Sequence, residues 1–246
     1  MSNTYIVPLD LGKKLDTDAV IVAFYVKDGT KNILVDTGYS IDYNFLKYFP
    51  EALTYPFERK EEQELPRVLH RLGLEIADID IIINTHLDMD HCTNDHLFVR
   101  AEVFVQRKEV QFRIAPDWLR KLKIPETPPR SVPGAFLAML SDGIPINFTL
   151  VDGHQDITDH VSVLPTPGHS PGHQSVVVKT DKRTIILAGD NVPKFENWEK
   201  WKVSFREEGT PAEQIILKSY EAMKKLSPDL VLPSHDAKVF QNKIYT

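Results

Sequence analysis

The chain has 246 residues and a formal net charge of −6, with 42% hydrophobic and 26% charged residues. These values are ordinary for a soluble globular protein of one or two domains that buries a hydrophobic core. The acidic balance and the scattered Lys and Arg residues argue against a nucleic-acid partner, which would need clustered positive charge. We therefore expect a small-molecule substrate, and the sequence leaves a homodimer open.

The single cysteine, Cys92, bears on cellular location. A chain with one cysteine forms no intramolecular disulfide, which suits a reducing compartment. The first residues lack the basic-then-apolar pattern of a signal peptide. The longest apolar runs, such as residues 19–26, fall well short of the ~20 residues that span a bilayer. We therefore expect a cytoplasmic protein with no membrane partner.

The N-terminal part predicts a β-hairpin. Residues 19–26 and 33–35 are apolar runs, and residues 27–30 between them read Lys-Asp-Gly-Thr. This segment suits a hairpin turn because Asp-Gly tolerates positive φ.

A helix is predicted over residues 61–72. Pro66 lies in its first turn, where the missing N–H does no harm, and Gly73 is a suitable C-cap. One face of this helix collects four apolar side chains, Leu65, Val68, Leu69 and Leu72.

Further strands and one amphipathic helix follow along the chain. The strands are predicted at residues 79–83, 101–106, 161–164, 175–179, 184–188 and 230–232, and the helix at 212–226. Residues 112–147 contain six prolines, which interrupt regular structure and leave room only for short helices at 118–122 and 135–140. We interpret this stretch either as an insertion that shapes a pocket or as a solvated connector, within one domain spanning residues 1–246.

Candidate metal ligands gather after the ends of predicted strands. Four lie within six residues and three more follow later in the chain: His86, Asp88, Asp90, His91, His169, Asp190 and His235. Histidine and carboxylate together are the usual ligands of Zn, Fe or Mn, and α/β folds tend to place chemistry at strand ends. A lone histidine is more often a surface or core residue, but that reading does not explain the whole set. The pattern therefore predicts a metal site.

Five segments that contain these residues resemble the metallo-β-lactamase fold superfamily, especially its N-acyl homoserine lactonase-like branch. They read ILVDTG, DIDIIINTHLDMDHCTNDHLF, LPTPGHSPGHQSVVV, ILAGDNV and VLPSHD, in the expected order over nearly the whole chain. The resemblance implies an α/β fold, a four-layer αββα sandwich, with a dinuclear metal site at one edge.

The resemblance also implies a role for each ligand. His86, Asp88 and His169 would bind one metal, and Asp190 would bridge the two metals. The other metal would be bound by Asp90, His91 and His235. Asp36, at the end of ILVDTG, would orient a ligand histidine through its N–H, and the alternative is a plain strand-terminating turn.

The sequence departs from the family pattern at three positions. The usual motif is His-x-His-x-Asp-His, and its second histidine is replaced by Asp88. Lactonase-like members often carry a Tyr three residues after the bridging Asp, where it polarises the lactone, and here that position is Pro193. The residue before His235 is commonly Gly and here is Ser234. The change at Pro193 keeps other hydrolase activities open.

Asp88 adds a negative charge to the ligand set. A more negative set should weaken the Lewis acidity of the metals, and its oxygen donor favours Fe or Mn relative to Zn. Flavodiiron proteins are similar in using a Glu at this position, but this chain has no flavodoxin-like module. We expect two divalent metal ions, zinc first, with iron or manganese as the alternative. Another interpretation is that Asp88 turns away and leaves one site weak or empty.

The resemblance implies a metal-dependent hydrolase acting on a lactone or related ester. A hydroxide held between the metals would attack the carbonyl carbon, with Asp90 and Asp190 as catalytic residues and Asp90 able to take a proton. The alternatives are a phosphotriesterase, thioesterase or β-lactamase on the same fold, and, less favoured, a di-iron redox protein.

Other residues near the motifs receive weaker hypotheses. Cys92 is either a nucleophile or ligand or, more in keeping with its type, a small buried thiol. His96 and His173 are expected beside the ligands or at the surface. Six residues are candidates for lining a substrate pocket: Lys194, Phe195, Trp198, Trp118, Phe136 and Met139.

Overall fold

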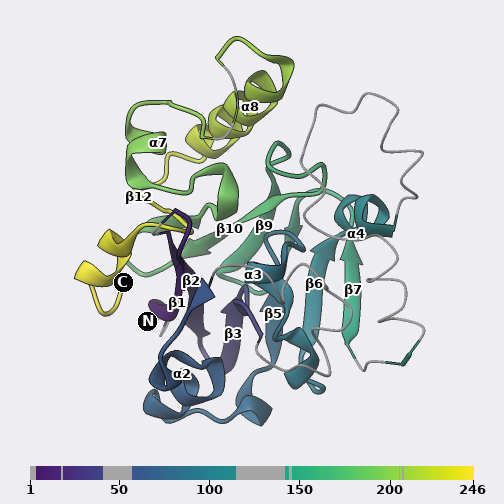
Figure 1. The fold of residues 1–246 in the computed structure, drawn as a ribbon, viewed down its shortest axis with the longest axis vertical. Helices are drawn as coiled ribbons and strands as arrows, with labels where there is room; N and C mark the ends of the chain where they lie inside the picture. Colours follow the sequence, from purple (N-terminus) through teal and green to yellow (C-terminus); the bar gives the residue numbers. More distant parts are fainter. Residues whose placement is uncertain are drawn as a thin grey trace.

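The computed structural model describes residues 4–17, 19–40, 57–114, 142–143, 146–204, 206 and 208–246. In these residues two β-sheets pack face to face, and helices cover the outer face of each (Figure 1). This arrangement confirms the predicted αββα sandwich.

The first sheet has the strand order β4-β1-β2-β3-β5-β6-β7. Its strands, in chain order, are β1 Tyr5–Lys14, β2 Val20–Asp28, β3 Lys31–Val35, β4 Phe57–Glu58, β5 Ile81–Ile83, β6 Glu102–Gln106 and β7 Asn147–Val151. Strands β1, β2 and β3 are antiparallel to one another, whereas β3, β5, β6 and β7 run parallel. The parallel strands therefore end at one common edge of the sheet.

The second sheet has the order β12-β11-β10-β9-β8. Its strands are β8 Gln155–Asp156, β9 Val161–Pro165, β10 Gln174–Lys179, β11 Thr184–Leu187 and β12 Leu230–Leu232. Strands β8 to β11 are antiparallel neighbours, and β12 pairs with β11 in parallel. Strands β11 and β12 therefore also end at a common edge.

Strand β2 shows how the sequence builds both layers. Phe24 and Val26 point into the core between the sheets, while Ala23 and Tyr25 point into the core under the outer helices. Side chains alternate across a strand, so a strand buried on both faces needs a continuous apolar run. The unbroken hydrophobicity of residues 19–26 has this physical cause.

The helices fall into two sets. Helices α2 (Leu65–Arg71), α3 (Met89–Cys92) and α4 (Arg107–Ile114) pack on the first sheet, and α7 (Phe195–Glu199) and α8 (Pro211–Lys225) pack on the second. Helix α8 begins with Thr210, whose hydroxyl accepts the Glu213 N–H. It buries Ile216, Tyr220 and Met223 against the sheet, and it begins and ends one residue earlier than the amphipathic pattern predicts.

Three sequence expectations need adjustment. The predicted helix over residues 61–72 is a short 3-10 turn followed by α2. Leu72 is the C-cap of α2 and has 41% of its surface exposed, so it does not belong to the buried face of the helix. Residues 112–114 complete α4, and residue 147 begins β7, so both ends of the proline-rich stretch belong to regular elements. The short helices expected at 118–122 and 135–140 lie outside the described residues, as does the pocket role given to this stretch.

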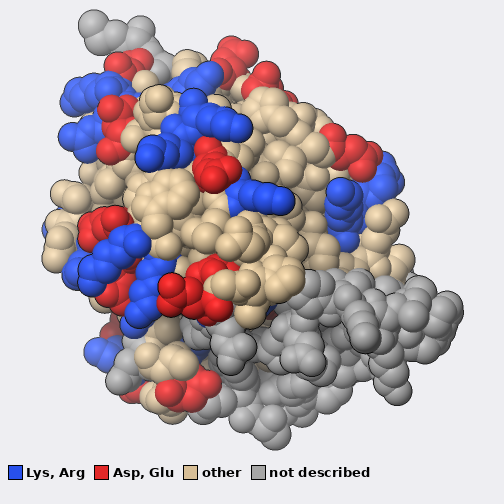
Figure 2. Space-filling view, turned by 90° about the horizontal axis from the view of Figure 1, so that it is seen from above, with Lys and Arg blue, Asp and Glu red and all other residues tan. Residues whose placement is uncertain are grey.

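The two ends of the described chain meet beside the first sheet. Ile6 in β1 forms an antiparallel bridge with Tyr245, and Figure 1 places both termini on the same side of the molecule. Among the described helices, none is long and apolar enough to cross a membrane. On the face drawn in Figure 2, the coloured Lys and Arg side chains are interspersed with Asp and Glu.

Gly172 lies where the loop after β9 passes over the start of α4. A Cβ atom at this position would lie 2.0 Å from the Glu109 backbone nitrogen, so this close approach tolerates only a hydrogen. We expect Gly172→Ala to lower the free energy of unfolding by about 1–3 kcal/mol, the usual cost of overpacking. Urea denaturation measures this change.

Gly73→Ala is the matched control. Gly73 also sits in a loop, with φ +75°, but a Cβ atom there would meet nothing within 4 Å. We expect Gly73→Ala to lower the free energy of unfolding by about 1 kcal/mol, the cost of the positive φ alone. A Gly172→Ala variant no less stable than Gly73→Ala would contradict the packing argument.

Candidate metal centre

Two groups of side chains meet where the strands of both sheets end. One consists of His86 from the loop after β5, His169 from the loop between β9 and β10, and Asp190 in a 3-10 turn after β11. In each group the ligand atoms all lie within 4.8 Å of one another. The other group consists of Asp90 and His91 in α3 and His235 after β12.

Asp190 lies between the groups and faces both. Its Oδ2 is 4.0 Å from His86 Nε2 and 3.7 Å from His169 Nε2. Its Oδ1 is 3.2 Å from His91 Nε2 and 3.0 Å from His235 Nε2. Its Oδ2 also lies 3.2 Å from His235 Nε2, so one carboxylate faces both pairs of histidines.

The other ring nitrogens of His91 and His235 are held by hydrogen bonds. His91 Nδ1 lies 2.8 Å from Asp36 Oδ2, and His235 Nδ1 lies 2.7 Å from the Val20 carbonyl oxygen. A proton on each Nδ1 makes these hydrogen bonds, so Nε2 is the ring nitrogen that faces the site and can bind a metal ion. Asp36 has φ 60° and also accepts the N–H and the hydroxyl of Thr85, so its carboxylate is fixed in place.

The donor set fits divalent metal ions. His86 Nε2 and His91 Nε2 are buried and make no hydrogen bond within the described residues, an arrangement that costs free energy unless a ligand is bound. Each group brings imidazole nitrogens and a carboxylate oxygen close together, as the binding of Zn²⁺ and similar ions requires. Burial lowers the pKa of His86, which favours the neutral imidazole that binds metals. Burial also acts to lower the pKa of His91, but Asp190 and then Asp36 outweigh it and hold that pKa well above its ordinary value, so a metal ion bound there displaces a proton from His91.

Asp88 turns toward the first group, but it is paired with a cation. Its Oδ2 lies 3.0 Å from His169 Nε2 and 3.4 Å from His86 Nε2. Its Oδ1 lies 2.6 Å from the guanidinium of Arg113, which is buried in α4. Burial raises the pKa of Asp88, but Arg113 and then His86 outweigh it and hold the pKa well below its ordinary value.

Arg113 changes the charge expected of this ligand set. The sequence predicts that Asp88 makes the set one unit more negative, and the guanidinium restores that unit. The predicted loss of Lewis acidity is therefore offset, whereas the oxygen donor that favours iron or manganese remains. The orientation of Asp88 also differs from the alternative in which its side chain turns away.

Glu109 joins the loops that carry the ligands. It is fully buried, and its Oε1 accepts the Leu87 N–H at 3.1 Å and the Arg113 Nε–H at 2.9 Å. Its Oε2 accepts the Ser170 hydroxyl and, at 3.3 Å, the Gly172 N–H. One carboxylate of α4 therefore holds the loop of His86 and the loop of His169 together.

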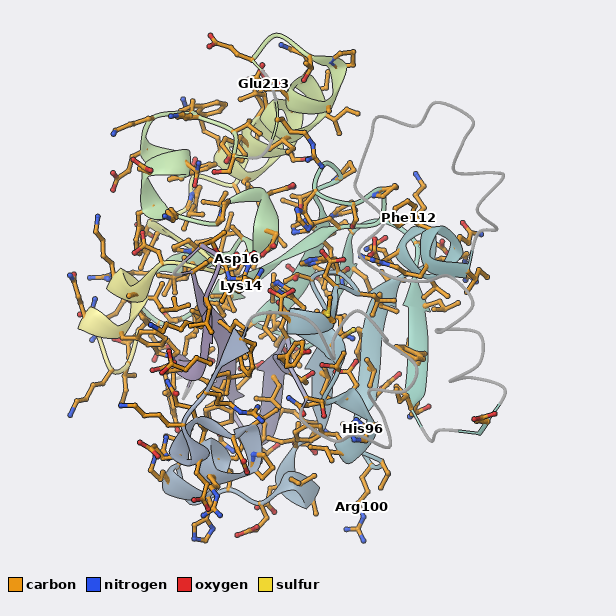
Figure 3. The ribbon with its side chains drawn as sticks, in the orientation of Figure 1. Lys14, Asp16, His96, Arg100, Phe112 and Glu213 are labelled. Atoms are coloured by element: carbon orange, nitrogen blue, oxygen red, sulfur yellow. The ribbon has the colours of Figure 1, made fainter. Side chains whose placement is uncertain are left out.

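Lys14, the last residue of β1, enters the second group. Its side chain is 8% exposed, and its Nζ lies 2.5 Å from Asp90 Oδ2 and 3.4 Å from His235 Nε2. Burial raises the pKa of Asp90, but the Lys14 ammonium and His91 outweigh it and lower the pKa. Figure 3 shows Lys14 near the middle of the molecule.

The remaining sequence candidates belong to neither ligand group. Cys92 is buried, and burial raises the pKa of its thiol, which suits a packed side chain. His173 stands behind His86, with ring centroids 5.4 Å apart, and its Nδ1 is 2.9 Å from the Thr166 carbonyl oxygen. Trp198 stacks on Trp201 in the core under α8.

His96 and the pocket candidates Lys194 and Phe195 have their contacts outside the ligand groups. His96 Nδ1 lies 3.0 Å from the Thr93 carbonyl oxygen, Lys194 is exposed, and Phe195 packs against the core between the sheets. Trp118, Phe136 and Met139 lie outside the described residues.

Four residues at the site escaped the sequence analysis or were undervalued by it. Glu109 and Arg113 are four apart on one helix, a spacing that pairs opposite charges and was available as a signal. Ser234 donates its hydroxyl to Asp190 Oδ1 at 2.7 Å, so its replacement of the usual glycine has a structural effect. Lys14 had no local signal, because its partners are far away in the sequence.

Comparisons with known proteins agree with this geometry. Residues 16–235 match the family described as the metallo-beta-lactamase superfamily. An N-acyl homoserine lactonase from Bacillus sp is 29% identical over 174 residues, covering 68% of this chain and 62% of that protein. The aligned part therefore spans less than two thirds of that relative.

Solved structures share the fold. An N-acyl homoserine lactone hydrolase with the product N-hexanoyl-L-homoserine at its catalytic metal center superposes with a TM-score of 0.73, at 22% identity, covering 98% of this chain and 96% of that one. AidC, a dizinc quorum-quenching lactonase, superposes with a TM-score of 0.62 at 19% identity, covering 89% and 73%.

A four-layer sandwich with His and Asp ligands at its strand ends defines the class of metallo-β-lactamase-type proteins. The family match extends over most of the chain, and the chain belongs to the metallo-beta-lactamase superfamily.

Asp95 is a buried carboxyl group behind the ligand helix α3. Its oxygens accept the Thr37 hydroxyl at 2.6 Å and the Asn84 amide at 2.6 Å. Burial raises its pKa to about 7. The folded protein therefore retains a proton on Asp95 at pH values where the unfolded chain has lost it.

This proton makes stability depend on pH in a defined direction. The contribution of Asp95 is complete below pH ~4 and is lost as pH rises through about 7, because the unfolded chain binds fewer protons over this interval. We expect the free energy of unfolding of the wild type, relative to Asp95→Asn, to fall across this range by at most about 1.4 kcal/mol per pH unit. Urea denaturation at a series of pH values tests this, and a difference that stays constant or rises with pH would refute it.

Proposed function

We propose that the chain is a metal-dependent hydrolase that opens a lactone or a related ester. The observation that carries the proposal is the pair of ligand groups that share Asp190 at the strand ends. The lactonases found among its relatives and structural neighbours support the lactone as the substrate class.

The proposal assigns one metal ion to His86, Asp88 and His169, with Asp190 between the two ions. The other ion is assigned to Asp90, His91 and His235. Zinc is our first choice, because the donor set is rich in imidazole, Arg113 offsets the charge of Asp88, and AidC is a dizinc enzyme.

Bound divalent ions in such a site polarise a carbonyl oxygen and make water a stronger nucleophile. The residues of the chain hold and orient the reacting parts. In this proposal Asp190 holds the two ligand groups at a fixed separation, and the Ser234 hydroxyl supports its carboxylate. Asp90 takes up a proton during turnover. Asp36 and the Val20 carbonyl keep two histidines aimed at the site.

The proline at position 193 is the reason for testing substrates other than lactones. It is buried beside the site, and its carbonyl oxygen accepts the His235 N–H at 2.9 Å. A proline side chain has no hydroxyl with which to polarise a lactone. An arylester, thioester or phosphotriester substrate is therefore the second candidate.

Hydrolysis of a lactone panel is the direct test. N-acyl homoserine lactones and simple γ- and δ-lactones are offered to the protein loaded with Zn, Mn, Fe or Co, and ring opening is followed by proton release. We expect turnover with at least one metal, and Asp190→Ala to lower kcat/KM by about 100-fold or more, since even partners that only support a ligand are worth 10–100-fold.

Asp152→Ala is the matched control, because Asp152 is an exposed carboxylate paired with Arg107. It is expected to leave kcat/KM unchanged. Turnover of thioesters or phosphotriesters but no lactone would move the assignment to the second candidate. Turnover by Asp190→Ala equal to wild type on every substrate would remove the hydrolase proposal.

Metal removal gives a test that needs no substrate. Binding to the folded state alone stabilises it by about 2.7 kcal/mol when the free metal exceeds its Kd 100-fold. We therefore expect chelator-treated protein to gain several degrees in Tm when Zn²⁺ is restored, and a variant with both His86→Ala and His91→Ala to gain little. An equal gain in both proteins would contradict metal binding at these groups.

A further inference from the structure

Lys14 is a buried amine placed among the proposed ligands of one metal. Its ammonium is 2.5 Å from Asp90 Oδ2 and 3.4 Å from His235 Nε2, two of the three ligand atoms of that group. Lysine is almost never fully buried unless it is paired. The pairing here is with atoms that the proposed function assigns to a metal.

The backbone fixes Lys14 in this position. The pairing of β1 with β2 shifts register between Asp10 and Lys13, and such a bulge re-aims the side chains that follow it. Beyond the shift, the Lys14 N–H donates to the Ala19 carbonyl oxygen at 2.8 Å. Lys14 also pairs with Phe57 in β4. The end of β1 is therefore held from both sides with its side chain directed inward.

The Lys14 ammonium and a metal ion compete for the lone pairs of the same ligand atoms. His235 Nδ1 is taken up by the Val20 carbonyl oxygen, so the lone pair on Nε2 faces Lys14. Zinc binds carboxylate oxygen and imidazole nitrogen at ~2.0–2.2 Å, inside the space that the ammonium reaches. Two positive charges at such separation repel each other strongly in a buried site. The Lys14 ammonium therefore opposes the entry of a metal ion into this group.

The first group has its cation in a different place. The Arg113 guanidinium contacts Asp88 Oδ1, and the other oxygen of that carboxylate faces His86 and His169. Arg113 thus neutralises the ligand from outside the group, whereas Lys14 contacts the ligand atoms themselves. The two groups differ in access although their ligand types are similar.

We propose that Lys14 acts as a built-in cation of the second group, so that the two metals bind in sequence and with unequal affinity. The inference rests on the metal groups of the proposed function but not on its substrate. The metal of His86, Asp88 and His169 binds first and tightly. The metal of Asp90, His91 and His235 binds in competition with the Lys14 ammonium.

Metal titration of the full chain tests this without any substrate. Zn²⁺ is titrated calorimetrically into chelator-treated protein, and Co²⁺ absorption reports the coordination of each bound ion. We expect wild type to take up one equivalent tightly and a second about 10–100-fold more weakly, a factor typical of groups that tune metal ligands. Lys14→Met is expected to strengthen the second step by a similar factor and to leave the first unchanged.

Two further Lys14 variants separate charge from shape. Lys14→Gln is neutral but keeps a hydrogen-bonding end, and it should behave like Lys14→Met. Lys14→Arg keeps the positive charge, and it should retain the weak second step. Far-UV circular dichroism and Tm establish which variants are folded, and Lys14→Gln decides the question if Lys14→Met is not.

Lys13→Met is the matched control. Lys13 is the neighbouring residue of the same strand, partly exposed and 3.4 Å from Glu58 Oε2. It carries the same charge but points away from the ligands, so the variant should bind both metals as wild type does. His169→Ala should abolish the tight first step and thereby locate it.

The outcomes separate this inference from the proposed function. Two equally tight equivalents in wild type, or a second step that Lys14→Met and Lys14→Gln leave unchanged, overturns the role of Lys14 while the metal sites stand. Absence of metal binding in every variant overturns the metal sites and this inference together. Absence of lactone hydrolysis alone bears only on the substrate.

Discussion

The carboxylate of Asp190 is the contact on which the geometry of the site depends. It lies between the two pairs of histidines and contacts both, so its position sets the distance between the two ligand groups. Gly189 precedes it with φ 59°, in a turn where a Cβ atom would lie 2.5 Å from His173 Nε2. Ser234 then fixes one oxygen from the neighbouring strand end. The parallel pairing of β11 and β12 brings these two residues together.

Buried charges are balanced locally around this carboxylate. Asp88 is matched by Arg113, Arg113 also contacts Glu109, and Asp90 is matched by Lys14. Unpaired buried charges are very costly, so each of these side chains depends on its partner for burial. The negative charges of the ligand motif are therefore balanced by the positive charges of a lysine in β1 and an arginine in α4.

The sequence predicts well whatever follows from local pattern. The buried strands read as apolar runs, and the candidate ligands follow strands, so the strands and the general position of the site could be predicted from local pattern. The αββα arrangement was implied by the family resemblance and not by these runs. Leu72 was misplaced because the helix ends one residue before it, and helix ends are weakly encoded. The bounds of β1 and β7 were missed because their apolar residues are interrupted by polar ones.

Long-range contacts between side chains could not be predicted from the sequence. Lys14 precedes Asp90 by 76 positions, and only the register shift in β1 directs it toward α3. Arg113 reaches Asp88 because Gly172 lets α4 approach the loop after β9 closely. Neither contact leaves a periodic signal, because each depends on how separate elements pack.

The pairing of Asp88 with Arg113 also constrains how this ligand set arises in evolution. Replacing Asp88 by the histidine common in the family would leave a buried guanidinium with its contact to Glu109 but without its strongest acceptor. Replacing Arg113 first would leave Asp88 as an uncompensated buried acid. We expect either single step to give a less stable protein, so the two positions should change together, with the carboxylate and its counter-ion acting as one unit.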